Sequence, residues 1–128
     1  MRGRPRIGRG VRISVAPGAR VVLEDGCVLA DGSVIEAHDG TVRIGPGARI
    51  GEHALLVARA GIDVGAGVDV GDWAVIADTE PAFAERAAPV RLGDGARIGL
   101  HAAVVAGATV APGDVVAAYE TRAPRRSA

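Results

Sequence analysis

A period of six residues is the sequence feature that most constrains the fold of this chain. Aliphatic residues recur at every sixth position in one run, Leu92, Ile98, Val104, Val110 and Val116. The same spacing appears upstream at Ile44, Ile50, Leu56 and Ile62, and after a shift of two residues at Val64, Val70 and Ile76. Six fits neither the 3.6-residue period of a helix nor the alternation of a long strand. It predicts short extended runs joined by tight corners, with one aliphatic side chain per run facing inward.

Small residues repeat with the same period. The residue four positions after each aliphatic is Ala in much of the chain, and this column breaks at Asp114. Glycine, which occurs 19 times, suits sharp corners because it tolerates positive φ, and each Gly inside a helix would cost about 1 kcal/mol. Hexapeptide repeats of this kind are typical of an all-β parallel β-helix.

Length and composition limit the other possibilities. The 128 residues leave no room for a second sizeable core, so residues 1–128 are expected to form a single β-helix domain. Residues 1–12 and 122–128 are rich in Arg and are predicted to be solvated, poorly ordered termini. The 15 basic residues are balanced by 15 acidic ones, which argues against nucleic-acid binding.

Two further observations concern the setting of the protein. No apolar stretch approaches the roughly 18 residues of a membrane span, and no signal-peptide pattern follows the basic start. The single cysteine, Cys27, excludes an intramolecular disulfide. We therefore expect no membrane association and a cytoplasmic location.

The largest interruption of the repeat is predicted to be an external loop near residues 77–91. This segment has no six-residue order, and it contains Asp78, Glu80 and the only phenylalanine, Phe83. Loops that leave a regular solenoid often carry binding groups. The segment is therefore a candidate functional loop, with a tolerated insertion as the alternative.

Two histidines occupy equivalent places in the repeat. His53 and His101 each lie three residues after an inward aliphatic, Ile50 and Ile98. That place is a corner, so both rings should point toward solvent or toward a neighbouring subunit. They are either polar corner residues or general bases at a subunit interface, since neutral imidazole suits proton transfer near pH 7.

With these residues in view, the chain resembles the hexapeptide-repeat acyltransferases, the enzymes of the maltose, galactoside and xenobiotic acetyltransferase group. The repeat over roughly residues 42–124 carries the resemblance, together with the run Pro89–Gly99 that ends the loop. The resemblance implies a left-handed parallel β-helix with about 18 residues per coil, hence about five to six coils. It also implies a homotrimer, which would cover the flat Val- and Ala-rich sides of such a prism.

The resemblance further implies a reaction. In this family a His between subunits deprotonates the hydroxyl or amine of a small-molecule acceptor, which attacks the thioester of acetyl-CoA. Pro81 stands where the family has that His, and Arg97 stands where it usually has Trp. An active enzyme would therefore need His53 or His101 as the replacement base. Asp78 or Glu80 would orient that base, as the carboxylate does in a catalytic triad.

The C-terminal residues look like a shortened form of the family's last coil. By that resemblance, Ala117 and Ala118 would offer backbone groups to the pantetheine arm of acetyl-CoA. Thr121 and Arg122 would complete the cofactor site, with the Arg122 guanidinium facing the phosphates.

Two main hypotheses follow from these observations. One is a CoA-dependent acyltransferase with a displaced base. The other is a non-catalytic β-helix scaffold or pseudoenzyme of the same family, which Pro81 and Arg97 favour. A zinc carbonic anhydrase of the same β-helix class is a weaker alternative, because its paired His lie five residues apart, whereas His38, His53 and His101 are separated by 15 and 48. No metal is predicted.

Overall fold

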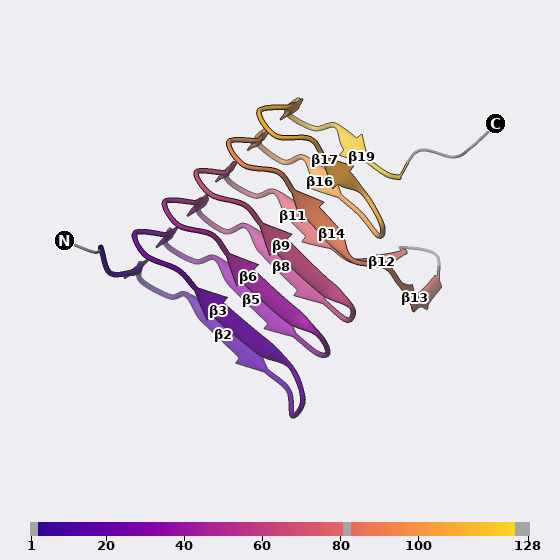
Figure 1. The fold of residues 1–128 in the computed structure, drawn as a ribbon, viewed down its shortest axis with the longest axis horizontal. Coiled ribbons are helices and arrows are strands. Elements are labelled where there is room, and N and C mark those ends of the chain that lie inside the picture. The colour runs from indigo at the N-terminus through magenta and orange to yellow at the C-terminus, as the bar shows by residue number, and fades with distance from the viewer. Residues whose placement is uncertain (1–2, 81–82, 125–128) are drawn as a thin grey trace.

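The computed structural model describes residues 3–80 and 83–124, with side chains for residues 3–79 and 87–124. This part of the chain consists of strands and turns without a helix. It forms a left-handed parallel β-helix, as the resemblance implied, although right-handed crossovers are the general rule for parallel strands. Figure 1 shows the coils stacked from the N-terminal to the C-terminal end.

Three parallel sheets form the sides of this solenoid. Sheet 1 contains β1 (Arg6–Ile7), β4 (Val28–Leu29), β7 (Arg49–Ile50), β10 (Asp69–Val70), β15 (Arg97–Ile98) and β18 (Val115–Val116). Sheet 2 contains β2 (Arg12–Val15), β5 (Val34–Ala37), β8 (Leu55–Ala58), β11 (Val75–Ala77), β16 (Ala103–Val104) and β19 (Thr121–Arg122). Sheet 3 contains β3 (Arg20–Leu23), β6 (Thr41–Ile44), β9 (Gly61–Val64), β14 (Val90–Leu92) and β17 (Thr109–Val110). Five complete coils and a partial sixth result.

The coils differ in length. In sheet 1 the register runs from Arg6 to Val28, Arg49 and Asp69, steps of 22, 21 and 20 residues, and only the step from Arg97 to Val115 has 18. The early coils are longer because their strands in sheets 2 and 3 have four residues, so that two alternate side chains face inward. Ile62 and Val64 are such a pair in β9, which explains the shift of two residues in the sequence repeat.

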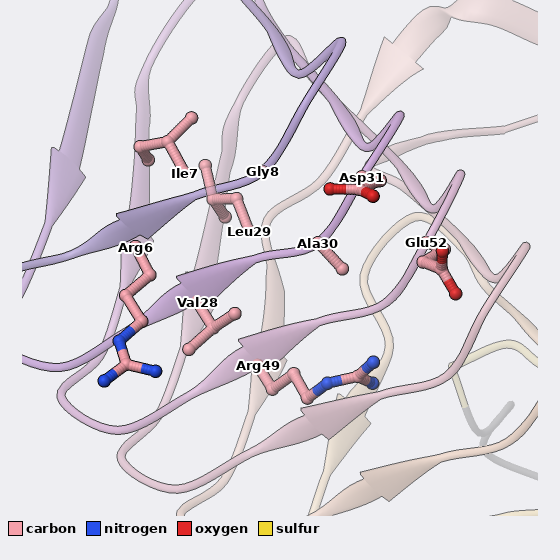
Figure 2. A pocket seen from close by; sticks show the side chains of 9 residues that line it. All are labelled: Arg6, Ile7, Gly8, Val28, Leu29, Ala30, Asp31, Arg49 and Glu52. Atoms are coloured by element: carbon pink, nitrogen blue, oxygen red, sulfur yellow. The ribbon is translucent and has the colours of Figure 1, made fainter.

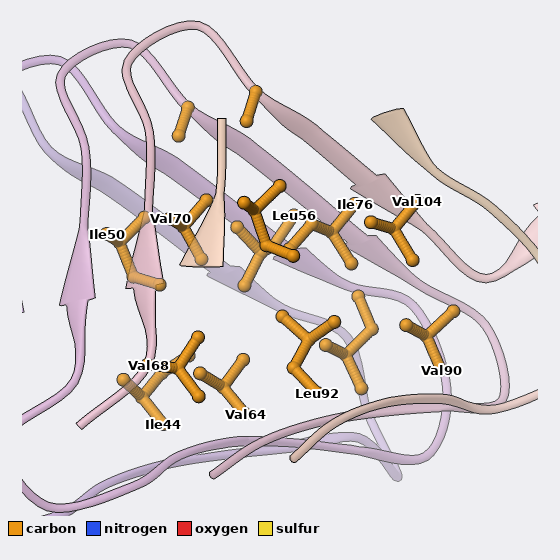
Figure 3. Packing of buried hydrophobic residues seen from close by; sticks show 14 of the residues in the cluster. Ile44, Ile50, Leu56, Val64, Val68, Val70, Ile76, Val90, Leu92 and Val104 are labelled. Atoms are coloured by element: carbon orange, nitrogen blue, oxygen red, sulfur yellow. The ribbon is translucent and has the colours of Figure 1, made fainter. Parts of the chain in front are cut away.

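The inward side chains form one continuous core along the axis. The aliphatics of the six-residue repeat, from Ile44 to Val116, are at most 2% exposed. Figure 3 shows side chains from successive coils stacked in rows between the sheets. The small column keeps the corners narrow, since Ala54, Ala74 and Ala102 are fully buried. This packing confirms the inward positions predicted from the repeat.

Backbone packs directly on backbone where the coils turn. A Cβ atom added at Gly99 would lie 2.5 Å from the backbone nitrogen of Ala118 in the next coil. Such a separation is shorter than any van der Waals contact, so the stacking of coils requires glycine there.

The external loop lies between β11 and β14, as predicted. Part of it is regular, because β12 (Thr79–Glu80) and β13 (Phe83–Ala87) pair as antiparallel strands. Figure 1 shows this hairpin projecting from the side of the stack. The interruption therefore leaves the coils above and below it in register, with Val75 paired to both Leu55 and Ala103.

The basic terminal segments overlap the outer coils. Arg6, Ile7 and Arg12 lie in strands paired with the second coil, and Arg122 lies in β19, paired with Val104. These residues therefore add strands to existing sheets, while the poor order expected of segments 1–12 and 122–128 stays a prediction. Residues 1–2 and 125–128 lie outside the described part of the chain.

Candidate functional site

The two histidines lie at the corner between sheet 1 and sheet 2. Both are exposed, and both have a positive φ, 58° for His53 and 55° for His101. Each backbone N–H donates to a carbonyl one coil earlier, His53 to Asp31 at 3.1 Å and His101 to Asp72 at 3.0 Å. The structure thus confirms that the histidines are equivalent corner residues facing outward.

Two further aromatic residues occupy the same corner. Trp73 and Tyr119 also have positive φ, 62° and 65°, and are 51% and 71% exposed. The four rings stack in coil order. The centroids of His53 and Trp73 lie 4.4 Å apart, those of Trp73 and His101 6.0 Å, and those of His101 and Tyr119 5.3 Å. We call these four residues the aromatic ladder.

The ladder occupies backbone positions that normally favour glycine. At the same corner the first two coils have Gly10 and Gly32, and the corner between sheets 3 and 1 has glycine at positions 26, 47, 67, 95 and 113. A residue with a side chain costs roughly 1–2 kcal/mol in this left-handed region. Stacked rings return about 0.5–1.5 kcal/mol per pair. Strained positions of this kind cluster at functional surfaces, so the ladder is a candidate contact surface.

Trp73 and Tyr119 were not predicted as site residues, although their spacing in the sequence marks them. Each lies three residues after an inward valine, Val70 and Val116, the same spacing that singled out the two histidines. The position three residues after an inward aliphatic of sheet 1 therefore identifies all four residues of the aromatic ladder.

The carboxylate of Asp78 is bonded to the backbone of the coil before it. Its side chain is fully buried, and its carboxylate accepts three backbone N–H bonds from the turn one coil earlier. Oδ1 accepts from Arg59 at 2.7 Å, and Oδ2 accepts from Ala60 at 2.7 Å and Gly61 at 2.6 Å. The carboxylate therefore holds the corner beneath the external loop. The side chain of Glu80 and the whole of Pro81 lie outside the described residues.

Arg122 lies at the C-terminal end of the core. Its Nε donates to Glu120 Oε2 at 2.9 Å, and its Nη1 donates to Asp114 Oδ2 at 3.3 Å. Arg122 follows Val104 in an inward column of sheet 2, and register places Glu120 after Ala102 and Asp114 after Ala96. In the last coil, three polar residues thus take the inward positions held by apolar residues in the coil before. Joined by ion pairs, they form a polar lid on the core, as a terminal repeat requires.

Charge and hydrogen bonding shift the pKa values of the three ionisable groups in this lid. The backbone N–H of Val115, and then Arg122, lower the pKa of Asp114, while the N–H of Ala117, and then Arg122, lower that of Glu120. The two carboxylates raise the pKa of Arg122 in turn, Glu120 more than Asp114. All three groups are therefore charged at neutral pH and engaged with one another.

The other predicted cofactor residues surround this lid. Ala117 donates its N–H to Glu120 Oε1 at 2.9 Å and accepts the Glu120 N–H at 3.0 Å, so its backbone groups are used within the coil. Ala118 and Thr121 are exposed. A hollow of about 350 Å³ lies beside Arg122 at the other end of β19, lined by Gly107, Thr109, Arg122, Ala123 and Pro124.

The remaining reactive groups offer little chemistry. Cys27 is fully buried, and burial raises the pKa of its thiol, which keeps it protonated and a poor nucleophile. Among the described residues, no three His, Cys, Asp or Glu side chains are grouped to hold a metal ion. A helix able to cross a membrane is also absent from the part of the chain that the structure describes.

The outer surface of sheet 2 differs from those of the other sheets. Two outward columns run along its middle, and six of their members there are apolar: Val34, Leu55, Val57, Val75, Ala77 and Ala103. Glu36 occupies the second column beside Val34, in register with Val57. We call these six residues the apolar face. Val75, at its centre, is 37% exposed. The aromatic ladder borders this face. Each of its rings lies two residues before a residue of the first outward column, namely Leu55, Val75, Ala103 and Thr121.

The outward positions of the other two sheets carry charges. Sheet 1 has Arg6, Arg49, Asp69 and Arg97, and sheet 3 has Arg20, Arg43, Asp63 and Arg91. Arg43 bonds to Asp63 at 2.7 Å and to Glu24 at 2.5 Å. Among the three flat sides described here, sheet 2 therefore carries the least charge, with Glu36 at the margin of the apolar face.

Comparison with known proteins finds no matching family model and no matching curated protein. Among solved structures, the chain is similar to the N-terminal domain of CcmM, determined in complex with CcmN. The TM-score is 0.56 at 17% identity, over 95% of this chain and 86% of that one. At this identity the likeness shows the fold alone: the chain is a β-helix domain.

Proposed function

We propose that the chain is a cytoplasmic, non-catalytic β-helix scaffold that assembles with copies of itself through the apolar face. The observation that carries this proposal is the difference between the three sides of the solenoid. One side is apolar along its centre, while the other two carry rows of charge. A contiguous apolar surface on a soluble domain is typical of an interface.

A second copy of the same face is the occupant that fits best. The six residues of the apolar face are uncharged, with Glu36 at their margin. Cyclic association of identical subunits closes such surfaces without leaving one exposed. The family resemblance favours three copies. The aromatic ladder, along the edge of the same face, would then lie where neighbouring subunits meet.

The positions of the predicted catalytic groups also support a scaffold. The rings of His53 and His101 lie on either side of Trp73 in a stack. Asp78 is bonded to three backbone amides, and Arg122 is bonded to two carboxylates. The CcmM domain, which shares the fold, was determined in complex with another protein. A β-helix of this kind can therefore serve as a binding module.

We expect the protein to sediment as three times its 12.9 kDa chain mass, and Val75→Glu to reduce it to the monomer. The carboxylate would lie at the centre of the buried interface, where an unpaired charge is strongly unfavourable. Sedimentation equilibrium would measure the mass, and circular dichroism would establish that the variant is folded.

Val22→Glu is the matched control. Val22 is 38% exposed and faces outward from sheet 3, opposite Arg43 in the register. This variant should keep the mass of the wild type. A monomeric wild type, or an unchanged mass for Val75→Glu, would contradict the proposal.

The second candidate function is transfer of an acetyl group from acetyl-CoA to a small-molecule acceptor. The hollow beside Arg122 supports it, because the resemblance assigns Arg122 to the phosphates of the cofactor. Calorimetric titration of acetyl-CoA should then give one site per subunit with a micromolar dissociation constant, roughly −8 kcal/mol. His53→Ala or His101→Ala should lower turnover. Absence of heat at millimolar acetyl-CoA would exclude this candidate.

A further inference from the structure

We propose that the N-terminal end of the solenoid binds an extended acidic segment of a partner protein, whose apolar side chains close the end of the core. This end is formed by strands β1, β2 and β3 of the first coil, and we call it the open end. The proposal concerns a surface separate from the apolar face on the side of the solenoid.

The open end exposes side chains that belong to the core columns. Ile7, Ile13 and Val15 pair in register with Leu29, Ile35 and Ala37, which are at most 2% exposed. The three residues of the first coil are 50%, 41% and 48% exposed. Their inward position means that they surround the end of the core itself.

The opposite end of the solenoid is closed. There the column of Ile13 ends in Arg122, which bonds to Glu120 and Asp114, and the column of Ile7 ends in Val116, which is fully buried. Solenoids need polar terminal repeats for solubility. The chain provides one such lid at its C-terminal end, whereas Ile7, Ile13 and Val15 leave apolar surface at the other.

The open end also presents unpaired strand edges. β1, β2 and β3 are each the last strand of their sheet. Arg6, Gly8 and Arg12 donate their N–H groups to the second coil. Because backbone groups of successive residues point to opposite sides of a strand, the N–H and C=O groups of Ile7 and Ile13 face away from that coil. An extended segment can add to such an edge through main-chain hydrogen bonds.

Charge indicates which segment fits. The first coil, residues 3–23, contains Arg4, Arg6, Arg9, Arg12 and Arg20 and no acidic residue. A second copy in a head-to-head arrangement would bring ten arginines together, which like-charge repulsion disfavours. A lipid surface would satisfy the arginines but leave the strand edges without hydrogen-bond partners. An acidic segment with alternating apolar residues satisfies the charges, the edges and the exposed core.

Two hollows beside the first coil offer space for side chains of such a segment. One, of about 290 Å³, is lined by Arg6, Ile7, Val28, Arg49 and neighbouring residues, with the two guanidinium groups on one side of it in Figure 2. The other, of about 490 Å³, lies on the far side of Asp31 and includes Arg9, Arg12 and His53. Both combine two arginines with aliphatic residues, Ile7, Val28 and Leu29 in the first and Val34 in the second, and both also include the carboxylate of Asp31, with Glu52 in the first.

The test uses a fluorescent nine-residue peptide of alternating Val and Glu as the probe, with a Val–Lys peptide as its control. We expect saturable binding of the Val–Glu peptide to the full chain, measured by fluorescence anisotropy, and at least tenfold weaker binding of the Val–Lys peptide. Ile13→Glu and Arg12→Glu should each weaken Val–Glu binding at least tenfold. Val115→Glu, an exposed valine at the other end of sheet 1, and Arg91→Glu should leave it within twofold.

Several outcomes would overturn the proposal. These are no saturable binding at millimolar Val–Glu peptide, equal binding of the Val–Lys peptide, or unchanged binding by Ile13→Glu. Binding to phosphatidylserine vesicles without peptide binding would favour a lipid surface instead. A loss of oligomer mass in Ile13→Glu would indicate that a second copy covers this end. The Val75→Glu variant should still bind the peptide, which separates this test from that of the apolar face.

Discussion

Replacing Asp78 with asparagine is expected to lower the free energy of unfolding by about 1–3 kcal/mol, the range for leaving a buried hydrogen-bonding group without its partner. The two carboxylate oxygens accept three N–H bonds from Arg59, Ala60 and Gly61. In asparagine one of these oxygens becomes an NH₂ group, which faces backbone donors and cannot accept from them. At least one buried N–H group then loses its partner, and the remaining bonds lose the charge that strengthens them. Urea unfolding followed by circular dichroism would measure the loss.

The control for this substitution is Asp69→Asn. Asp69 is exposed on sheet 1, and its contact with Arg49 is a loose surface pair at 3.7 Å. Its loss should change stability by less than about 1 kcal/mol. If Asp78→Asn were equally mild, the carboxylate would be free of a structural role, and its predicted part in orienting a catalytic His would regain support.

Leu56→Ala is expected to cost about 2–5 kcal/mol, the second large effect. Leu56 is fully buried in β8, between Ile35 in the coil before and Ile76 in the coil after. The strands on both sides are fixed by their own ladder bonds, so the cavity cannot collapse readily. Because each coil contacts only its neighbours, a weakened third coil should also broaden the unfolding transition by uncoupling the two halves of the solenoid.

The same substitution at an exposed site provides the comparison. Leu100 lies at the corner next to His101 and is 42% exposed, so Leu100→Ala should change stability by less than about 0.5 kcal/mol. Thermal and urea unfolding of both variants would check the difference. Similar losses in the two variants would contradict the inward assignment of Leu56.

Much of the fold was predictable because the inward positions follow a short period. Ile50, Leu56 and Ile76 were assigned to the core from spacing alone, and all three are fully buried. The corner location of His53 and His101 followed from the same spacing. The handedness did not, because six-residue periodicity is equally compatible with either hand and only the family resemblance chose the left.

The candidate site was less predictable, because its contacts join residues in different coils. Asp78 is an acidic loop residue in the sequence, and its partners at positions 59–61 lie 17 to 19 residues earlier. Arg122 is one of several C-terminal arginines, and its role as a lid depends on lying above Val104. Local sequence cannot show either contact.

Residue spacing alone predicts a parallel β-helix with an aliphatic core, since one inward side chain per short run is enough to produce the repeat. The roles of the outer residues depend instead on contacts between coils. The rings of the aromatic ladder come together, Asp78 reaches its three amides, and one end of the core closes while the other stays open. These features depend on which residues lie above one another, and that depends on coil lengths that range from 18 to 28 residues.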